Sequence, residues 1–138
     1  MSFLLDTNVV SEWVKPHPNA AVIAWLDEVD EDRVFLSVIT LTELRYGIER
    51  LAAGKRRKRL EDWLHIELTL RFEGRILDID PTVANACGEL LAQREAAGRP
   101  ISAMDAYLAA IAEVHHLTLV TRNDSDFEGT VRCLNPWS

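Results

Sequence analysis

Short apolar runs without regular polar alternation recur along this chain, separated by longer segments with helical periodicity. The runs lie at Phe3–Leu5, Val34–Ser37, Arg75–Ile79 and Leu117–Thr121, with a weaker fifth at Val131–Leu134. Strands without alternation suit a sheet that is buried on both faces, which is typical of parallel sheets. The pattern therefore predicts a parallel central sheet of four or five short strands.

Helical periodicity fills the intervals between these runs. The predicted helices span Val9–Val14, Asn19–Asp30, Leu41–Ala53, Arg56–Arg71, Thr82–Ala97 and Ala103–His115. Strands that alternate with helices predict an α/β fold with helices flanking the sheet. With 138 residues and no repeat or linker, we expect one domain over residues 1–138.

Acidic residues follow three of the predicted strands. Asp6 ends the first strand, and Glu43 comes soon after the second, within Thr40-Leu41-Thr42-Glu43. The fourth strand is followed by Asn123, Asp124 and Asp126, and Asp105 opens a long helix. Because the carboxyl ends of parallel strands meet at one edge of a sheet, these acids are candidates for a shared site.

Each acid also has a local structural explanation. Asp6 could cap the helix that starts near Val9, and Glu43 could complete a capping box with Thr40 as its N-cap. Asp105 has the same spacing from Ser102, and the aspartates after the fourth strand could fix a turn. Capping alone, however, does not require several acids at one edge.

Carboxylates brought together repel one another, and a hard divalent cation relieves that repulsion. Mg²⁺ and Mn²⁺ prefer oxygen ligands and serve phosphate chemistry. The chain has no cluster of cysteines and histidines, which disfavours zinc. The acidic pattern therefore indicates a Mg²⁺ site, in which Mn²⁺ can substitute.

The charge of the chain is acidic overall, at −7, but it contains one concentrated basic run. Lys55–Arg59 consists of five consecutive cations. It is either a solvated helix start or a patch that contacts a nucleic-acid backbone. Its position in the sequence does not separate these two interpretations.

Cysteine content and hydropathy indicate the compartment. Cys87 and Cys133 have no metal-like or repeated spacing, so a disulfide framework is not expected. No apolar run is long enough to span a membrane, and no signal-peptide pattern opens the chain. We therefore expect a cytoplasmic protein with no membrane partner.

Six stretches carry a resemblance to a known family over nearly the whole chain. They are LLDTNVVSEW, LSVITLTELRYGIERL, GRILDID, ISAMDAYLAAIA, LTLVTRNDSDF and the closing LNPW. In this order, they resemble PIN-domain ribonucleases of the VapC type, toxins of type II toxin–antitoxin pairs, and most closely the FitB-like group. The resemblance implies a three-layer PIN-like fold.

The resemblance also implies roles for individual residues. Asp6, Glu43 and Asp105 match the family's core acids, which would be catalytic and would bind the metal. Thr7 and Thr121 match hydroxyl positions that support this pocket.

The chain departs from the family pattern at the fourth acid. Many relatives have an aspartate directly after Thr-Arg, where this chain has Asn123. Asp126 or Asp124 could supply the missing carboxylate, and we rank Asp126 first because a TRNxxDF pattern recurs among similar toxins.

The implied activity is a Mg²⁺-dependent endoribonuclease that hydrolyses RNA phosphodiester bonds. The implied partners are an RNA substrate, a small antitoxin and a second copy of the chain, with a higher toxin–antitoxin assembly as an extension. Candidate RNA contacts are Arg45, Lys55, Arg56, Arg57 and Arg122.

Other functions compete with this hypothesis. A catalytically weakened PIN-like module that acts by binding a partner protein is kept open by Asn123. A phosphatase of the haloacid dehalogenase type would need an aspartate at the position of Asn8, which disfavours it. A structure-specific DNA nuclease of related fold is a further alternative, although the chain lacks extra segments for gripping duplex ends.

Overall fold

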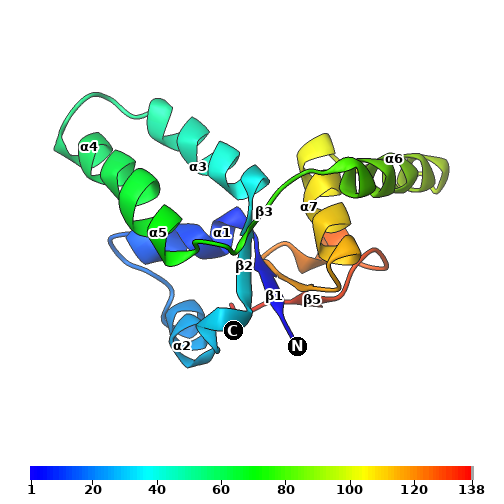
Figure 1. Cartoon of the computed structure of the whole chain (residues 1–138), viewed down its shortest axis with the longest axis horizontal. Helices are drawn as coiled ribbons and strands as arrows, with labels where there is room; N and C mark the ends of the chain where they lie inside the picture. The colour runs from blue at the N-terminus through cyan, green and yellow to red at the C-terminus, as the bar shows by residue number, and fades with distance from the viewer. Residues whose placement is uncertain (138) are drawn as a thin grey trace.

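The centre of the molecule is a parallel five-stranded sheet, seen in a computed structural model that describes residues 1–137 (Figure 1). Its strands are β1 (Phe3–Leu5), β2 (Val34–Ser37), β3 (Ile76–Leu77), β4 (Thr118–Val120) and β5 (Cys133–Leu134). They lie in the order β3-β2-β1-β4-β5, and every neighbouring pair is parallel. The predicted parallel sheet is confirmed, although β3 and β5 are shorter than their apolar runs.

Strand β1 occupies the middle of the sheet. Phe3 is in register with Val34 of β2 on one side and with Thr118 of β4 on the other. The Asp6 backbone N–H donates to the Val120 carbonyl at 2.9 Å, so pairing with β4 continues past the end of β1. The carboxyl ends of β1, β2 and β4 therefore share one edge.

Helices cover both faces of the sheet, which gives the three layers that the resemblance implies (Figure 1). The helical segments are α1 (Thr7–Val10), η1 (Ser11–Val14), α2 (Ala20–Glu28), η2 (Glu31–Arg33), α3 (Val38–Glu49), α4 (Lys55–Asp62), η3 (Trp63–Leu68), α5 (Thr69–Arg71), α6 (Pro81–Ala96), α7 (Ala103–Val114) and η4 (Asp124–Phe127). None of them is long and apolar enough to span a membrane, within the residues described.

Two hydrophobic cores lie on opposite faces of the sheet. Leu4 packs with residues of α6 and α7, whereas Leu5 packs with residues of α1, α2, α3 and η3. Successive strand residues point to opposite faces, so two adjacent leucines anchor two different layers. This explains why the β1 sequence lacks polar alternation.

The prediction that Thr40 caps a helix is wrong. Helix α3 begins at Val38, directly after β2, and Ser37 is its N-cap. The Ser37 hydroxyl accepts a hydrogen bond from the Thr40 backbone N–H at 3.3 Å. Because the chain enters the helix immediately at the strand end, Thr40 lies inside the first turn.

The predicted helix over Arg56–Arg71 is not a uniform α-helix. It divides into α4, a π-helical stretch (η3) and α5. The Thr69 hydroxyl donates a hydrogen bond at 2.9 Å to the Leu64 carbonyl, five residues earlier. This bond gives a carbonyl of the wider π-helical turn a side-chain partner. Helical periodicity alone does not reveal such a change of pitch.

Candidate active site

Asp6 is both a helix cap and the most enclosed acid at the sheet edge. One carboxylate oxygen accepts from the Thr7 backbone N–H at 2.7 Å, which caps α1. The other oxygen accepts a hydrogen bond at 2.8 Å from the hydroxyl of Thr121, the residue that directly follows β4. Asp6 is only 7% exposed, so the carboxylate that caps the helix is also buried at the edge of the sheet.

The pKa of Asp6 is raised above its ordinary value. Burial is the largest cause, and the charges of Glu43 and Asp105 add to it, against the lowering effect of the bonds from Thr121 and Thr7. Acids from α3 and α7 therefore face the carboxylate at the end of β1. The structure brings Asp6, Glu43 and Asp105 to one edge.

Glu43 is held by a contact far away in the sequence. Its Oε1 atom accepts a hydrogen bond from the Thr7 hydroxyl at 2.6 Å. The same hydroxyl lies 3.2 Å from the Thr40 hydroxyl. Thr7 thus connects Glu43 of α3 to the turn that carries Asp6.

Asp105 stands in the first turn of α7. The Ser102 hydroxyl accepts from the Asp105 backbone N–H at 3.2 Å, so Ser102 is the predicted N-cap. Burial raises the pKa of the Asp105 carboxyl, the Ser102 hydroxyl lowers it, and the nearby charge of Asp126 raises it. Asp105 therefore combines a position in the helix cap with membership of the acidic group.

The structure distinguishes the two candidates for the fourth acid. Asp124 accepts a hydrogen bond from the Asn135 side-chain amide at 3.1 Å, which fixes its loop to the segment after β5. Asp126 is exposed, and its charge acts on Asp105. Asn123 donates its backbone N–H to the Thr121 hydroxyl at 3.0 Å. This arrangement favours Asp126 as the fourth carboxylate.

Two residues at this edge were not predicted from the sequence. Thr40 is completely buried beside Thr7, and Asn135 bridges Asp124 and the Arg122 carbonyl. Asn135 lies within the LNPW motif, which was a usable signal. For Thr40 the sequence signal was misleading, because its spacing from Glu43 matches a capping box and so predicted an N-cap residue.

The donor set suits a hard cation chemically. The four acids offer carboxylate oxygens, and their mutual repulsion contributes to the raised pKa values of Asp6 and Asp105. As the side chains stand, no three Asp, Glu, His or Cys residues in the described part of the chain converge tightly on one point. Burial and the acids Asp124 and Asp6 raise the pKa of Cys133 to about 11, so its side chain is a protonated thiol near neutral pH.

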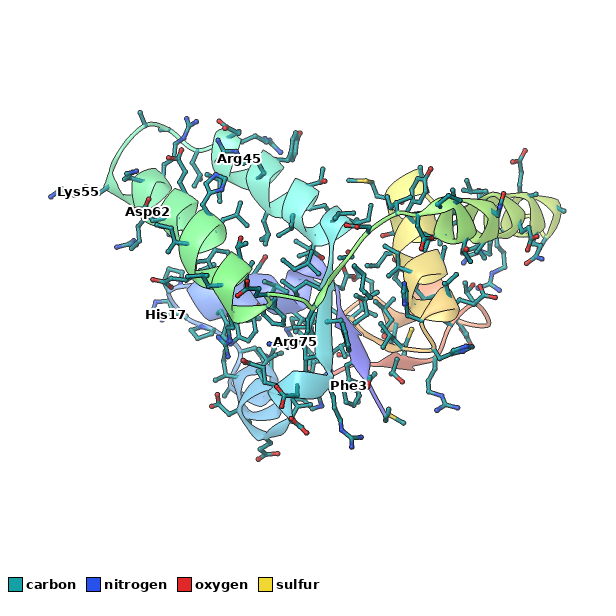
Figure 2. All side chains as sticks on the ribbon, viewed as in Figure 1. Phe3, His17, Arg45, Lys55, Asp62 and Arg75 are labelled. Atoms are coloured by element: carbon teal, nitrogen blue, oxygen red, sulfur yellow. The ribbon has the colours of Figure 1, made fainter. Side chains whose placement is uncertain are left out.

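Part of the predicted basic surface is neutralised within the molecule. Arg57 donates to Glu61 at 3.0 Å and also pairs with Glu49, which in turn binds Arg45 at 2.5 Å. Helix α4, Lys55–Asp62, is called the α4 arm below. Figure 2 shows Arg45 on α3 beside this arm, with Lys55 extending from its tip. Arg45 and Arg57 are therefore committed to internal ion pairs.

Other cations are left open to solvent. Arg56 and Arg59 are exposed, form no ion pair with a described residue, and line a groove of about 440 Å³ with Trp13 and Trp63. Arg122 lies next to the acidic edge, with its guanidinium 5.5 Å from the Trp137 ring centroid. The predicted RNA contacts thus divide into available and committed cations.

Comparisons with known proteins agree with this architecture. A family model described as PIN domain matches residues 3–132. Toxin FitB of Neisseria gonorrhoeae is 42% identical over 135 residues, 97% of this chain and 97% of that protein. VapC ribonuclease Y4jK of Sinorhizobium fredii is 38% identical over 135 residues, covering 97% and 96%.

A solved structure shows the same fold over almost the full length. The crystal structure of FitAcB from Neisseria gonorrhoeae superimposes with a TM-score of 0.93 at 41% identity, covering 98% of each chain. With the family model over residues 3–132 and these full-length relatives, the chain belongs to the PIN-domain family.

Proposed function

We propose that this protein is a metal-dependent endoribonuclease and the toxin of a toxin–antitoxin pair. The observation that carries the proposal is the buried Asp6 carboxylate, which faces Glu43 and Asp105 at the carboxyl edge of the sheet. The names of similar proteins, a toxin and a VapC ribonuclease, support this activity.

In this proposal Asp6, Asp105 and Glu43 hold Mg²⁺, and Mn²⁺ can replace it. When bound, such an ion lowers the pKa of a water ligand and stabilises negative charge on the transferring phosphorus centre. Asp126 completes the acidic group in the place where Asn123 carries no charge.

The protein's own side chains set the positions of these acids. Thr121 and the Thr7 backbone each hold one oxygen of Asp6, and the Thr7 hydroxyl holds one oxygen of Glu43. The second Glu43 oxygen is left to orient a water molecule for attack on phosphorus, with cleavage of the bond to the leaving oxygen. No covalent nucleophile is required.

The RNA substrate needs cations near an acidic site. Arg122 adjoins the acids, while Lys55, Arg56 and Arg59 are exposed on the α4 arm. We assign phosphate contacts to these residues, with Arg45 and Arg57 as structural cations. Such contacts predict cleavage that weakens as salt concentration rises.

The proposal includes a small antitoxin as inhibitor, a homodimer as the toxin's own assembly, and the cytoplasm as the place of action. A solved complex of similar fold, FitAB bound to a DNA fragment, supports the pairing with a second protein. An RNA substrate supports the cytoplasm as the place of action, because cellular RNA is found there.

The test is cleavage of a mixed RNA panel by purified, antitoxin-free protein with Mg²⁺, Mn²⁺ or EDTA. Asp6→Asn removes one site charge, and Asp27→Asn is the matched control on an exposed position of α2. We expect cleavage by the wild type and by Asp27→Asn that EDTA and Asp6→Asn abolish. Cleavage that persists in EDTA or in Asp6→Asn would overturn the proposal.

A module with weakened catalysis is the second candidate, and Asn123 is the observation that favours it. Asn123 is exposed next to Thr121, where an aspartate would add a carboxylate to the acidic edge without disturbing the core. If the wild type cleaves poorly and Asn123→Asp raises the rate, binding of a partner becomes the main role. If the wild type cleaves RNA well and Asn123→Asp leaves the cleavage rate unchanged or lowers it, the active nuclease is favoured.

A further inference from the structure

Thr40 places a fully buried hydroxyl beside the acidic edge. It is 0% exposed, and its Oγ1 atom lies 3.2 Å from Thr7 Oγ1. Thr7 Oγ1 in turn lies 2.6 Å from Glu43 Oε1. Thr7 at the start of α1 and two residues of α3, Thr40 and Glu43, thus form a continuous row of side-chain oxygens.

The number of protons fixes the direction of this row. A threonine hydroxyl has one proton, and a carboxylate only accepts. The Thr7 proton therefore goes to Glu43, the shorter and charge-assisted bond, and Thr7 accepts from Thr40. The other partner for Thr40, the Leu5 carbonyl at 3.5 Å, lies at the outer limit of hydrogen bonding.

Helix geometry keeps both ends of the row together. Thr40 and Glu43 are three residues apart in α3, so they lie on the same face of that helix. Thr7 enters from the turn after β1 and contacts both. A donated bond from Thr40 orients the Thr7 oxygen and strengthens its own donation to Glu43.

We propose that Thr40 is a positioning residue, which acts through Thr7 to hold the Glu43 carboxylate toward Asp6. The inference rests on the proposed function, because it specifies how one of its acids is aimed. It assigns Thr40 no contact with RNA or metal.

Helix α3 offers a matched control for the test. Thr42 is exposed, and its hydroxyl donates only to the Val38 carbonyl of its own helix. Thr40→Val and Thr42→Val therefore make the same chemical change in one helix, and Thr40→Ser retains the buried hydroxyl. Each variant would be assayed for RNA cleavage and, by titration calorimetry, for Mn²⁺ affinity.

We expect Thr40→Val to lower kcat by roughly 3- to 10-fold at unchanged KM, the size of one neutral hydrogen bond. Mn²⁺ affinity should fall with it, Thr40→Ser should restore both, and Thr42→Val should change neither. Wild-type behaviour of Thr40→Val, or equal losses in Thr42→Val, would overturn the proposal.

A double substitution separates positioning from packing. If Thr40 acts through Thr7, Thr40→Val should have no further effect on kcat in a Thr7→Val background. Full additivity of the two losses would show that Thr40 acts on its own and would overturn the inference.

The two readouts also separate this inference from the proposed function. Wild-type protein that binds Mn²⁺ without cleaving RNA would overturn the ribonuclease, while the Mn²⁺ affinities of the variants would still decide the role of Thr40. Equal Mn²⁺ affinity in the wild type and in Thr40→Val would overturn that role.

Discussion

The acidic edge of the sheet and the basic α4 arm differ in how their charged side chains are buried and paired. At the edge, Asp6 is buried among acids and is held by Thr121, 115 residues away in the chain. On the arm, Lys58 pairs with Asp62 and Arg57 with Glu61, each four residues apart. The edge gathers charges of one sign, whereas on the arm part of the positive charge is paired with nearby acids.

Under the proposed function, this difference separates the region that carries out the chemistry from the region that contacts the substrate. Exposed pairs four residues apart contribute a few tenths of a kcal/mol each and need no tertiary structure. A buried carboxylate that faces other acids costs free energy, which a fold tolerates where an ion or substrate offsets the cost. The experiments below test whether the edge and the arm separate functionally in the same way.

The largest effect is expected at Asp105. Asp105→Asn removes a charge from the edge but keeps a side chain of the same size, and Ser102 still caps α7. We expect cleavage to fall by roughly 10³-fold, the scale typical of a removed metal ligand or catalytic acid. A loss below tenfold, measured at saturating Mg²⁺, would remove Asp105 from the core acids.

The next comparison lies within the edge, between Asp126 and Asp124. Asp126→Asn should lower the cleavage rate by roughly 10- to 100-fold because its charge faces Asp105, whereas Asp124→Asn should cost only a few-fold. Asp124 already accepts a hydrogen bond from the Asn135 side-chain amide, and the side-chain oxygen of an asparagine at position 124 can still accept this bond. The reverse ranking of single-turnover rates would make Asp124 the fourth acid.

On the arm, Arg56 and Arg57 are adjacent but differ in their partners. Arg56→Ala should raise KM for RNA about 3-fold and flatten its salt dependence, since a phosphate contact is lost. Arg57→Ala should leave KM unchanged and lower the free energy of unfolding by about 0.5–1 kcal/mol, because two partly exposed ion pairs disappear. Equal KM values for both variants would contradict this division.

The smallest effect concerns the metal-free stability of the edge. The pKa of Asp6 is raised above its ordinary 3.8, so between 3.8 and the folded value the folded state binds more protons than the unfolded state. Stability therefore falls as pH rises through the folded pKa. In Asp6→Asn, the asparagine still caps the helix well. Because it has no carboxyl group to ionise, the variant does not lose stability as pH rises through this range.

In EDTA, Asp6→Asn should consequently have a higher Tm than the wild type at pH 7, and the difference should vanish toward pH 3.8. Mg²⁺ should raise the Tm of the wild type more than that of the variant. A lower Tm for Asp6→Asn in EDTA would show that its hydrogen bonds outweigh the charge cost.

The strands and the position of Asp6 could be predicted from the sequence because both follow local rules. Apolar runs without alternation located β1, β2 and β4, and parallel topology placed their ends together. The position of Glu43 after the second strand made it a candidate for the shared site, and the family resemblance implied its role as a core acid. Its actual partner, Thr7, is 36 residues away, and no local spacing reveals that contact.

Local rules failed where a nearby and a distant partner competed for the same group. Thr40 and Glu43 match a capping box, yet Ser37 caps the helix and Glu43 turns to Thr7. The basic run looked like one patch, yet Glu49 of α3 neutralises part of it once α3 and α4 pack together. Both outcomes depend on tertiary packing, which the sequence pattern does not contain.

The central place of β1 affects how the protein matures on the ribosome. β1 leaves first, but its neighbour β4 follows only at Thr118–Val120, and Thr121 completes the support of Asp6. Contacts between such distant segments form late and slow folding. A partly synthesised chain therefore carries Asp6, Glu43 and Asp105 without the strand that aligns them. The acidic edge therefore gains its full geometry only after Thr121 has left the ribosome, so it is among the last parts of this fold to form.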